Sequence, residues 1–375
     1  MTKKIVLAGG GTAGHVNPLL STALELRSRG YDVVALGTSQ GLETTLVPAA
    51  GVELVTIERV PLPRKPSLQF VSLPGRMKRA IAQCRSALSG ADALVGFGGY
   101  VSTPAYLAAR KMNLPIIIHE QNARPGLANR VGARWASALG LTFLSTPLKA
   151  KHGVTVVTGL PLRPAIQALA AARTTEEGRE SARRTAASKL GVDPNMQTLL
   201  ITGGSLGALN VNRAMVKVAA ELPEGVQVVH LTGKGKDQEV RDAVKAAGVA
   251  DRWHVIDYLS TMEDALAVAD LVVCRSGAGT VAEMTALGLP CVYVPLPIGN
   301  GEQKLNAADH VAQGGALLVA DHDLTSDYVR GTIFPLPGSE KLSEMAIASR
   351  ALAHPDGAQQ LADLIESTLQ KKDQK

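Results

Sequence analysis

The sequence predicts an α/β fold made of two Rossmann-like domains. A short apolar run, a glycine-rich turn and a helical pattern occur twice in that order, at 3–20 (KKIVLAGGGTAGHVNPLL) and at 197–215 (QTLLITGGSLGALNVNRAM). After each of these stretches, apolar runs alternate with amphipathic segments, which is the pattern of βαβ units and of a parallel sheet. At 375 residues the chain is also long for a single core.

The apolar runs are the expected strands. They lie at 5–8, 32–36, 93–97, 115–118 and 154–158 in the first half, and at 198–202, 226–231, 271–274 and 291–295 in the second. We expect Asn17 to cap the first helix, with Pro18 in its first turn, and Gly30 to end it.

The predicted domains are residues 1–164 and 165–355. The segment 164–195 is rich in alanine and in charges of both signs, so we expect a solvated helix beside the interdomain linker. We assign no function to its charged part. The tail 356–371 predicts one more amphipathic helix, which packs back on the first domain. Its apolar side chains are Leu361, Leu364, Ile365 and Leu369.

The composition excludes several classes of protein. Aromatic residues make up 3% of the chain, which argues against single-stranded nucleic-acid binding by base stacking. Cys84, Cys274 and Cys291 include no CxxC pair, so neither a disulfide framework nor a structural zinc site is expected. The apolar run 5–8 is too short for a signal peptide. The longest uncharged stretch near mid-chain, 93–109, contains three glycines and a proline, so no transmembrane helix is expected.

The formal net charge of +6 is unevenly distributed along the chain. Residues 1–164 contain 19 basic and 7 acidic side chains, whereas the remainder contains 20 basic and 26 acidic ones. The stretch 59–85 alone has seven basic residues and no acidic one. The first half should therefore attract anionic surfaces.

The first glycine turn has the spacing of a dinucleotide-binding turn at Gly9, Gly11 and Gly14. A nicotinamide site also needs an acidic residue about 20 positions later, at the end of the second strand. That strand ends in the uncharged residues 36–38, so the sequence argues against a dehydrogenase. The turn still offers N–H groups to an anion at a helix N-terminus. His15 is a candidate general base there, and the alternative is that it hydrogen-bonds the turn.

A second glycine loop, GFGGYVSTP at 96–104, follows another expected strand. Gly98 and Gly99 allow a ligand to approach the backbone closely, and the alternative is a tight strand-to-helix turn. Because the carboxyl ends of parallel strands share one edge of the sheet, two such loops fit an anionic ligand better than one.

The second half predicts a nucleotide site. In VVCRSGAGTVAEMTALGLP (272–290), a strand leads into a helix that we expect to begin near Gly279 and whose N–H groups can hold a diphosphate. Glu283 lies one turn into this helix and can bind a ribose diol. The alternative is an acid favoured by the helix dipole. The loops GGSLGA and PLPIGNGEQKLNA add the polar side chains of Ser205, Gln303 and Asn306.

Taken together, these motifs resemble the MurG family. The resemblance rests on GGGTAGH, GFGGYVSTP, HEQNARPGLAN, GLPLR, GGSLGA, RSGAGTVAE and GNGEQKLNA, which follow one another in order from residue 5 to about 310. Members of that family are glycosyltransferases that convert lipid I to lipid II in peptidoglycan synthesis. The resemblance implies a glycosyltransferase B fold, in which two Rossmann-like domains face each other across a cleft. It also implies that UDP-N-acetylglucosamine binds the C-terminal domain and the lipid acceptor the N-terminal one.

The resemblance also implies functional residues. His15 would be the catalytic base, and Gly98, Gly99 and Tyr100 would form a loop for the acceptor and its pyrophosphate. The implied donor contacts are Thr12, Ala13, Gly14, Asn122, Arg163, Ser205, Leu259, Ala278, Gly279, Thr280, Val281, Ala282, Glu283 and Gln303. The sequence departs from the family pattern in two places: Ala13 replaces a common glycine, and Leu160 replaces an asparagine that often precedes the proline near Arg163.

The implied reaction inverts configuration at the anomeric carbon, with UDP as the leaving group. Helix N-termini and Arg163 can stabilise its charge without a metal, so no cofactor and no metal site are expected. The sequence contains one Asp-x-Asp motif, Asp321-His322-Asp323, which we interpret as helix-start capping.

The resemblance implies a peripheral membrane protein on the cytoplasmic face of the plasma membrane, and the basic stretch fits binding to such an anionic surface. Met77, Ala80, Ile81, Cys84 and Leu88 recur at helical spacing. Basic side chains flank them and could bind anionic phospholipid. These are Arg76, Lys78, Arg79 and Arg85. The alternative is an ordinary amphipathic helix whose apolar side faces the core, because periodicity does not tell which way that side points.

Three other functions remain open at this stage. They are a UDP-sugar 2-epimerase of similar build, a glycosyltransferase with another lipid or small-molecule acceptor, and a nucleotide-binding module without activity. We expect UDP-N-acetylglucosamine, lipid I and an anionic phospholipid surface as partners, and no nucleic acid. Partners in cell-wall synthesis, the oligomeric state and the peptide of the acceptor are not readable from the sequence.

Overall fold

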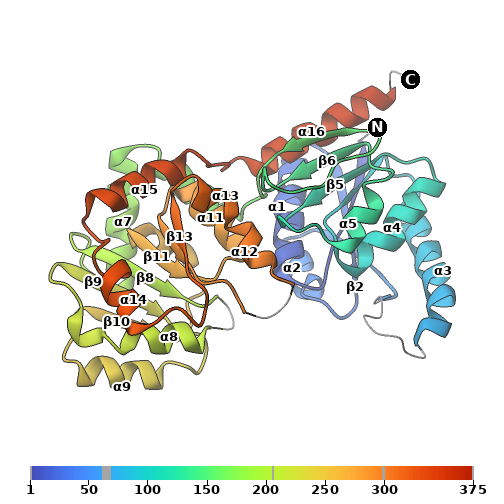
Figure 1. Ribbon diagram of the computed structural model, residues 1–375. Helices are drawn as coiled ribbons and strands as arrows, with labels where there is room; N and C mark the ends of the chain where they lie inside the picture. The colour runs from blue at the N-terminus through green and yellow to red at the C-terminus, as the bar shows by residue number, and fades with distance from the viewer. Residues whose placement is uncertain (1, 61–68, 205–206, 298–299, 374–375) are drawn as a thin grey trace. The chain divides into compact units, whose positions relative to one another are not determined.

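The computed structural model describes residues 2–60, 69–204, 207–297 and 300–373. The chain divides into two compact units (Figure 1), Met1–Arg163 with Asp356–Lys375 and Pro164–Pro355. Each unit contains one parallel sheet covered by helices, so the expected fold class is confirmed.

The sheet of the first unit has the strand order β3-β2-β1-β4-β5-β6-β7. Its strands are β1 (Lys4–Ala8), β2 (Asp32–Thr38), β3 (Glu53–Ile57), β4 (Ala93–Gly96), β5 (Ile116–Glu120), β6 (Ala138–Leu141) and β7 (Val154–Val157). Its helices are α1 (Ala13–Ser28), α2 (Glu43–Ala49), α3 (Gln69–Ala87), α4 (Gly99–Lys111), α5 (Leu127–Gly132) and α16 (Gly357–Asp373). The register places Val6 of β1 between Val34 of β2 and Leu94 of β4.

Both faces of this sheet are buried, which explains why its strands are continuous apolar runs rather than alternating ones. In β1, Ile5 and Leu7 belong to a buried cluster with side chains of α1 and α16. Val6 and Ala8 point to the other face and belong to a cluster with side chains of α3 and α4. The central strand is therefore inaccessible along its length, and only the loops at its ends remain available for function.

The C-terminal helix α16 packs against α1. Its expected apolar residues Leu361, Leu364, Ile365 and Leu369 are all buried in the cluster that contains β1. Arg29, just after α1, forms ion pairs with Asp363 at 2.6 Å and Glu366 at 2.9 Å. The last segment of the chain thus completes the first unit rather than the second.

The sheet of the second unit has the order β10-β9-β8-β11-β12-β13. Its strands are β8 (Gln197–Thr202), β9 (Val226–Leu231), β10 (Trp253–Ile256), β11 (Leu271–Cys274), β12 (Cys291–Tyr293) and β13 (Ala316–Leu318). Its helices include α6 (Pro164–Ala172), α7 (Glu176–Leu190), α8 (Leu209–Val216), η1 (Ala219–Glu221), α9 (Gln238–Ala246), α10 (Met262–Val268), α11 (Ala278–Leu287), α12 (Glu302–Asn306), α13 (Ala308–Ala312), α14 (Ser326–Tyr328), η2 (Val329–Ile333) and α15 (Glu340–Arg350).

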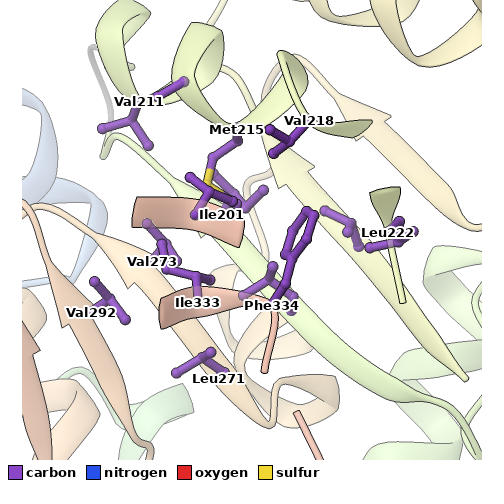
Figure 2. Close-up of a cluster of buried hydrophobic side chains, with 14 of the residues drawn as sticks. Ile201, Val211, Met215, Val218, Leu222, Leu271, Val273, Val292, Ile333 and Phe334 are labelled. Atoms are coloured by element: carbon purple, nitrogen blue, oxygen red, sulfur yellow. The ribbon is translucent and has the colours of Figure 1, made fainter. Parts of the chain in front are cut away.

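The core of the second unit is a large apolar cluster. Figure 2 shows Ile201 of β8 beside Met215 of α8, and Val273 of β11 beside Val292 of β12, in the cluster that also contains Phe334. These side chains are at most 6% exposed. The cluster therefore anchors β8 and β11, whose carboxyl ends lead into the glycine loops of this unit.

The expected strands are all present, but the sequence reading missed four others. These are β3, β6, β10 and β13, of which β3, β10 and β13 are only partly buried and β6 contains a glycine. All four lie at or next to a sheet edge, where short strands do not need a continuous apolar run, so their sequences carry no strong strand signal.

The prediction for the start of the first helix was wrong. Thr12, in an extended conformation, occupies the N-cap position, so α1 begins at Ala13 and Pro18 lies inside the helix. Because proline has no N–H, residue 18 cannot donate the helical hydrogen bond to the carbonyl of residue i−4, Gly14. Gly30 follows the C-cap with φ +86°, as expected of a helix-terminating glycine.

The segment 164–195 contains two helices, α6 and α7, instead of the single solvated helix we expected. The second of them packs against α10. Arg183 forms an ion pair with Asp270 at 2.9 Å, and Lys189 forms one with Asp264 at 2.8 Å. Part of the charge in this segment thus attaches α7 to the second unit.

Candidate functional site

The turn between β1 and α1 presents His15 at the start of a helix. Gly11 adopts φ +90°, a conformation that favours glycine, and lets the chain turn sharply into the N-cap residue Thr12. His15 lies in the first turn of α1, and its Nδ1 is 3.0 Å from the hydroxyl oxygen of Thr12. The N-cap residue thereby orients the ring.

The second glycine loop lies directly beside this histidine. Gly98 and Gly99 both have positive φ, +88° and +79°. A Cβ placed on Gly98 would lie 3.3 Å from His15 Nε2, and one on Gly99 would lie 2.8 Å from the carbonyl oxygen of Gly10. The hydroxyl of Ser102 donates to the carbonyl oxygen of Gly98 at 2.7 Å, which fixes the loop. The structure thus brings the two predicted loops of the first half together.

The environment of His15 suits a base. Burial lowers the pKa of its imidazole from the ordinary value of 6.5, although hydrogen bonding with the Gly10 backbone and the negative charge of Glu43 act in the opposite direction. An imidazole with a lowered pKa is mostly neutral at pH 7 and can accept a proton. The ring is only half-buried, so it remains accessible to a ligand.

The sequence analysis missed Glu43. It is fully buried, and its carboxylate accepts a hydrogen bond from the N–H of Gly11 at 2.8 Å and another from the N–H of Thr38 at 2.9 Å. Burial alone would raise the pKa of this carboxyl, but these hydrogen bonds outweigh it and lower the pKa. No local signal pointed to Glu43, because the turn it contacts lies 32 positions earlier in the chain.

The HEQN motif forms a buried network under the second loop. Glu120 accepts hydrogen bonds from the N–H of Asn122 and from the side-chain amide of Asn129, both at 3.0 Å. The hydroxyl of Tyr106 donates to Asn129 at 2.8 Å. Burial lowers the pKa of His119 to about 4, and its Nε2 is 2.9 Å from the carbonyl oxygen of Gly159. Most residues of this motif thus hold the loop in place by buried hydrogen bonds, whereas Asn122 is the one expected to contact the donor.

In the second unit, the first turn of α11 offers its amides to a ligand. The helix begins at Ala278 after Gly277, and no side chain of the described residues caps it. The first N–H groups of a helix have no intrahelical acceptor, so those of Ala278, Gly279 and Thr280 are available to an anion. The N–H of Val281 already donates to the carbonyl oxygen of Gly277 at 3.0 Å.

The side chains of α11 divide into two groups. Val281 and Ala282 are 1% and 9% exposed, so their side chains offer a ligand little or no surface. Thr280 and Glu283 are half-buried and remain accessible. A donor at this helix would therefore meet backbone amides first and the Glu283 carboxylate one turn later.

The other predicted donor residues are scattered over both units. Leu259 is half-buried in the loop after β10. The side-chain oxygen of Gln303 accepts a hydrogen bond from the N–H of Leu296 at 2.9 Å, so it also holds its own loop. Arg163 is half-buried at the end of the first unit. Ser205 lies outside the described residues.

The Asp-x-Asp motif does not cap a helix, so that interpretation was wrong. Thr325 caps α14 instead, accepting a hydrogen bond from the N–H of Tyr328. Asp321 forms an ion pair with Arg275 at 2.5 Å and accepts a hydrogen bond from Asn210 at 2.8 Å. Within the described part of the chain, no group of three or more His, Cys, Asp or Glu side chains could hold a metal ion.

The basic helix α3 turns its apolar side toward the core. Ala80, Cys84 and Leu88 are fully buried. Of the four basic residues predicted to bind lipid, Arg76 and Arg79 form ion pairs with Glu58, both at 3.0 Å. The other two, Lys78 and Arg85, are exposed. The alternative of an ordinary amphipathic helix is therefore correct for the apolar side of α3, which faces the core. The exposed side of this helix is basic.

The two halves of the sequence match the two domains of one glycosyltransferase family. Residues 5–140 match the glycosyltransferase family 28 N-terminal domain, and residues 198–361 match the glycosyltransferase family 28 C-terminal domain. Among curated proteins, a relative from Bifidobacterium adolescentis is 52% identical over 88% of both chains. One from Paenarthrobacter aurescens is 47% identical over 96% of this chain and 95% of the relative. Both are named UDP-N-acetylglucosamine--N-acetylmuramyl-(pentapeptide) pyrophosphoryl-undecaprenol N-acetylglucosamine transferase.

Solved structures agree with this result. Acinetobacter baumannii MurG has a TM-score of 0.78 at 27% identity and covers 97% of this chain, with 99% of its own chain matched. The UDP-GlcNAc 2-epimerase from Neisseria meningitidis has a TM-score of 0.66 at 17% identity, covering 99% of this chain and 100% of its own, which shows the fold alone. The chain therefore belongs to glycosyltransferase family 28 and, within it, to the family of UDP-N-acetylglucosamine--N-acetylmuramyl-(pentapeptide) pyrophosphoryl-undecaprenol N-acetylglucosamine transferases.

Proposed function

We propose that this chain transfers N-acetylglucosamine from UDP-N-acetylglucosamine to the C4 hydroxyl of the N-acetylmuramyl unit of lipid I, which yields lipid II. The observation that carries the proposal is the identity of 47–52% with relatives of that name over 88–96% of this chain. The candidate base His15 lies in the first unit, and the candidate ribose contact Glu283 lies in the second. The epimerase reading is weaker, because that likeness extends only to the fold.

His15 acts as the general base in this proposal. The acceptor hydroxyl attacks the anomeric carbon and loses its proton to the imidazole, while the bond between that carbon and UDP breaks, so the configuration inverts. The lowered pKa of His15 supports this role, because a neutral ring is ready to take the proton. The half-buried ring and its contact with the second glycine loop support an acceptor site in the first unit.

The second unit holds the donor in this proposal. The amides of Ala278, Gly279 and Thr280 bind the diphosphate, whose negative charge grows as UDP leaves. The carboxylate of Glu283 accepts hydrogen bonds from the ribose diol. Arg163 adds positive charge. Because helix N-termini and an arginine supply the stabilising charge, the proposal includes no metal and no other cofactor.

The protein works at an anionic membrane surface in this proposal. No helix among the described residues is long and apolar enough to span a bilayer. The exposed basic side of α3 supports binding by charge, with Lys78 and Arg85 as the residues not engaged by Glu58. The acceptor lies in the membrane, so a surface-bound enzyme would meet it at the cytoplasmic face.

A transfer assay tests the function directly. The protein is incubated with labelled UDP-N-acetylglucosamine, with and without lipid I, and the products are separated. Label in lipid II supports the proposal. Epimerised sugar nucleotide, transfer only to another acceptor, or donor binding without turnover each contradicts it and identifies the alternative.

A further inference from the structure

The glycine turn that carries His15 rests on a buried carboxylate with no direct part in the proposed reaction. Glu43 is the first residue of α2, and its Oε1 also accepts a hydrogen bond from the hydroxyl of Thr38 at 2.8 Å. We propose that Glu43 is a positioning residue for His15. Its carboxylate fixes the glycine turn that holds His15 and places a negative charge near the imidazole ring. This inference rests on the proposed transferase function.

The surroundings of Glu43 are shaped for its side chain. A Cβ on Gly10 would lie 2.5 Å from Glu43 Oε1, and one on Gly37 would lie 2.6 Å from its Cγ. A Cβ on Gly41 would overlap the carboxylate. Glycines at three positions thus leave room for this one side chain, which reaches from the start of α2 to the turn after β1.

A short chain of contacts connects Glu43 with His15. The carboxylate accepts a hydrogen bond from the N–H of Gly11, and the next residue, Thr12, is the N-cap of α1 and contacts His15 Nδ1. On the other side of the turn, Gly99 approaches the carbonyl of Gly10. If the Gly10–Gly11 peptide moves, the histidine and its contact with the second loop must move with it.

The charge of Glu43 also acts on the imidazole. The hydrogen bonds that the carboxylate accepts lower its pKa despite burial, so it is ionised near pH 7. Its charge raises the pKa of His15 against the larger effect of burial. Thr12 and the backbone of Gly98 and Gly99, which also adjoin the ring, carry no charge. Removal of the Glu43 charge should therefore lower the pKa of His15 further and weaken it as a base.

The test compares three variants with the wild type. Glu43→Gln should lower kcat on the order of 10²-fold, as expected when a reacting group is displaced by about 1 Å, and should move the acid limb of the kcat–pH profile to lower pH. Glu43→Asp keeps the charge but shortens the side chain, so kcat should fall while the acid limb stays near its wild-type position. Glu53→Gln, which removes an exposed carboxylate at the start of β3, is the matched control and should resemble the wild type.

A second measurement needs no catalysis. The histidine ring resonances of the free protein are titrated by NMR, and the His15 signal is assigned by its loss in His15→Gln. In Glu43→Gln the His15 signal should titrate at lower pH than in the wild type. If the wild type does not transfer sugar but this shift occurs, the proposed function fails while the positioning role of Glu43 stands.

Several outcomes would overturn the inference. A Glu43→Gln variant with wild-type kcat and a wild-type His15 titration would do so. So would a lower melting temperature with an unchanged acid limb and an unchanged titration, which would indicate a merely structural role. If Glu43→Gln does not fold, the folded Glu43→Asp variant decides: wild-type kcat would show that the reach of the carboxylate to Gly11 is not needed.

Discussion

The turn after β1 and the turn after β8 occupy the same place in their two sheets but differ in charge. In the first unit, the neighbouring strand β2 leads to Glu43, whose carboxylate accepts a hydrogen bond from the N–H of Gly11. In the second unit, the neighbouring strand β9 leads to a loop that contains Lys234, Lys236 and Asp237, and Asp237 forms an ion pair with Arg241 at 2.8 Å. The same topology thus places a buried anion beneath one turn and two cations after the corresponding strand of the other.

The difference teaches why glycine spacing alone did not identify the nucleotide site. A turn that already binds a carboxylate repels a diphosphate, however well its glycines match the dinucleotide pattern. We therefore expect the diphosphate of the donor at the second unit, where α11 has no acidic residue in its first turn.

The largest expected effect tests the first unit. His15→Ala should lower kcat by about 10²–10⁴-fold, the range of a lost general base, with little change in donor affinity. Because burial lowers the pKa of His15, protonation should reduce the wild-type rate only at pH values below the ordinary 6.5. Steady-state kinetics over a pH range measure both effects.

The control for this variant is His152→Ala, which removes an exposed histidine of the same unit and should leave kcat unchanged. If kcat falls by less than tenfold in His15→Ala, His15 only orients other groups and is not the general base. A large drop in melting temperature would instead favour the reading in which it only hydrogen-bonds the turn.

The next effect compares one glycine in each unit. Gly99→Ala should lower kcat on the order of 10²-fold, because its φ is +79° and the new Cβ would lie 2.8 Å from the carbonyl oxygen of Gly10, beside His15. Gly279→Ala meets nothing within 4 Å and should leave the melting temperature equal or higher. Thermal denaturation and kinetics of the two variants measure the contrast. Equal loss of kcat and of stability in both would contradict it.

A smaller effect belongs to the donor site alone. Glu283→Ala should raise the donor KM, because the ribose diol loses a charged hydrogen-bond acceptor that contributes roughly 1.5–3 kcal/mol. A calorimetric titration with UDP, without any acceptor present, should show the same loss of affinity. Donor affinity equal to that of the wild type would remove Glu283 from the proposed site. Glu302→Ala, at the exposed start of α12, is the matched control.

The sequence predicted the parts of the site that are local. Each glycine loop directly follows a buried strand, so a short window contains the strand, the turn and the helix, as for Gly98 and Gly99. His15 stood out because it is a titratable residue within such a window. The two-unit α/β fold was predictable for the same reason, since buried parallel strands are continuous apolar runs.

The contacts between distant segments were not predictable. Glu43 reads locally as an ordinary acid at the start of a helix, and only the fold brings it under Gly11. The direction of α3 was undecided, because an amphipathic pattern is the same whether its apolar side meets a core or a membrane. Glu58, which pairs with Arg76 and Arg79, precedes the basic stretch and was not connected with it.

The smallest expected effect concerns the binding of this basic surface to lipid vesicles. Loss of a basic side chain should weaken the binding, and loss of the acidic side chain beside it should strengthen it. If α3 binds anionic lipid by charge, Lys78→Gln or Arg85→Gln should each weaken binding to anionic vesicles by about fivefold, which corresponds to about 1 kcal/mol per basic residue. Glu58→Gln should strengthen binding by a similar factor, because it removes the acid that neutralises Arg76 and Arg79.

Vesicle sedimentation at low and at physiological salt measures these changes. Salt should reduce all of them, since exposed charges are screened beyond a Debye length of about 8 Å at physiological ionic strength. Lys217→Gln is the charge-matched control, because Lys217 is exposed in the second unit and its loss changes the net charge by the same amount. If Lys217→Gln weakens binding as much as Lys78→Gln does, net charge alone drives the binding. If Glu58→Gln leaves binding unchanged, the exposed side of α3 does not face the lipid.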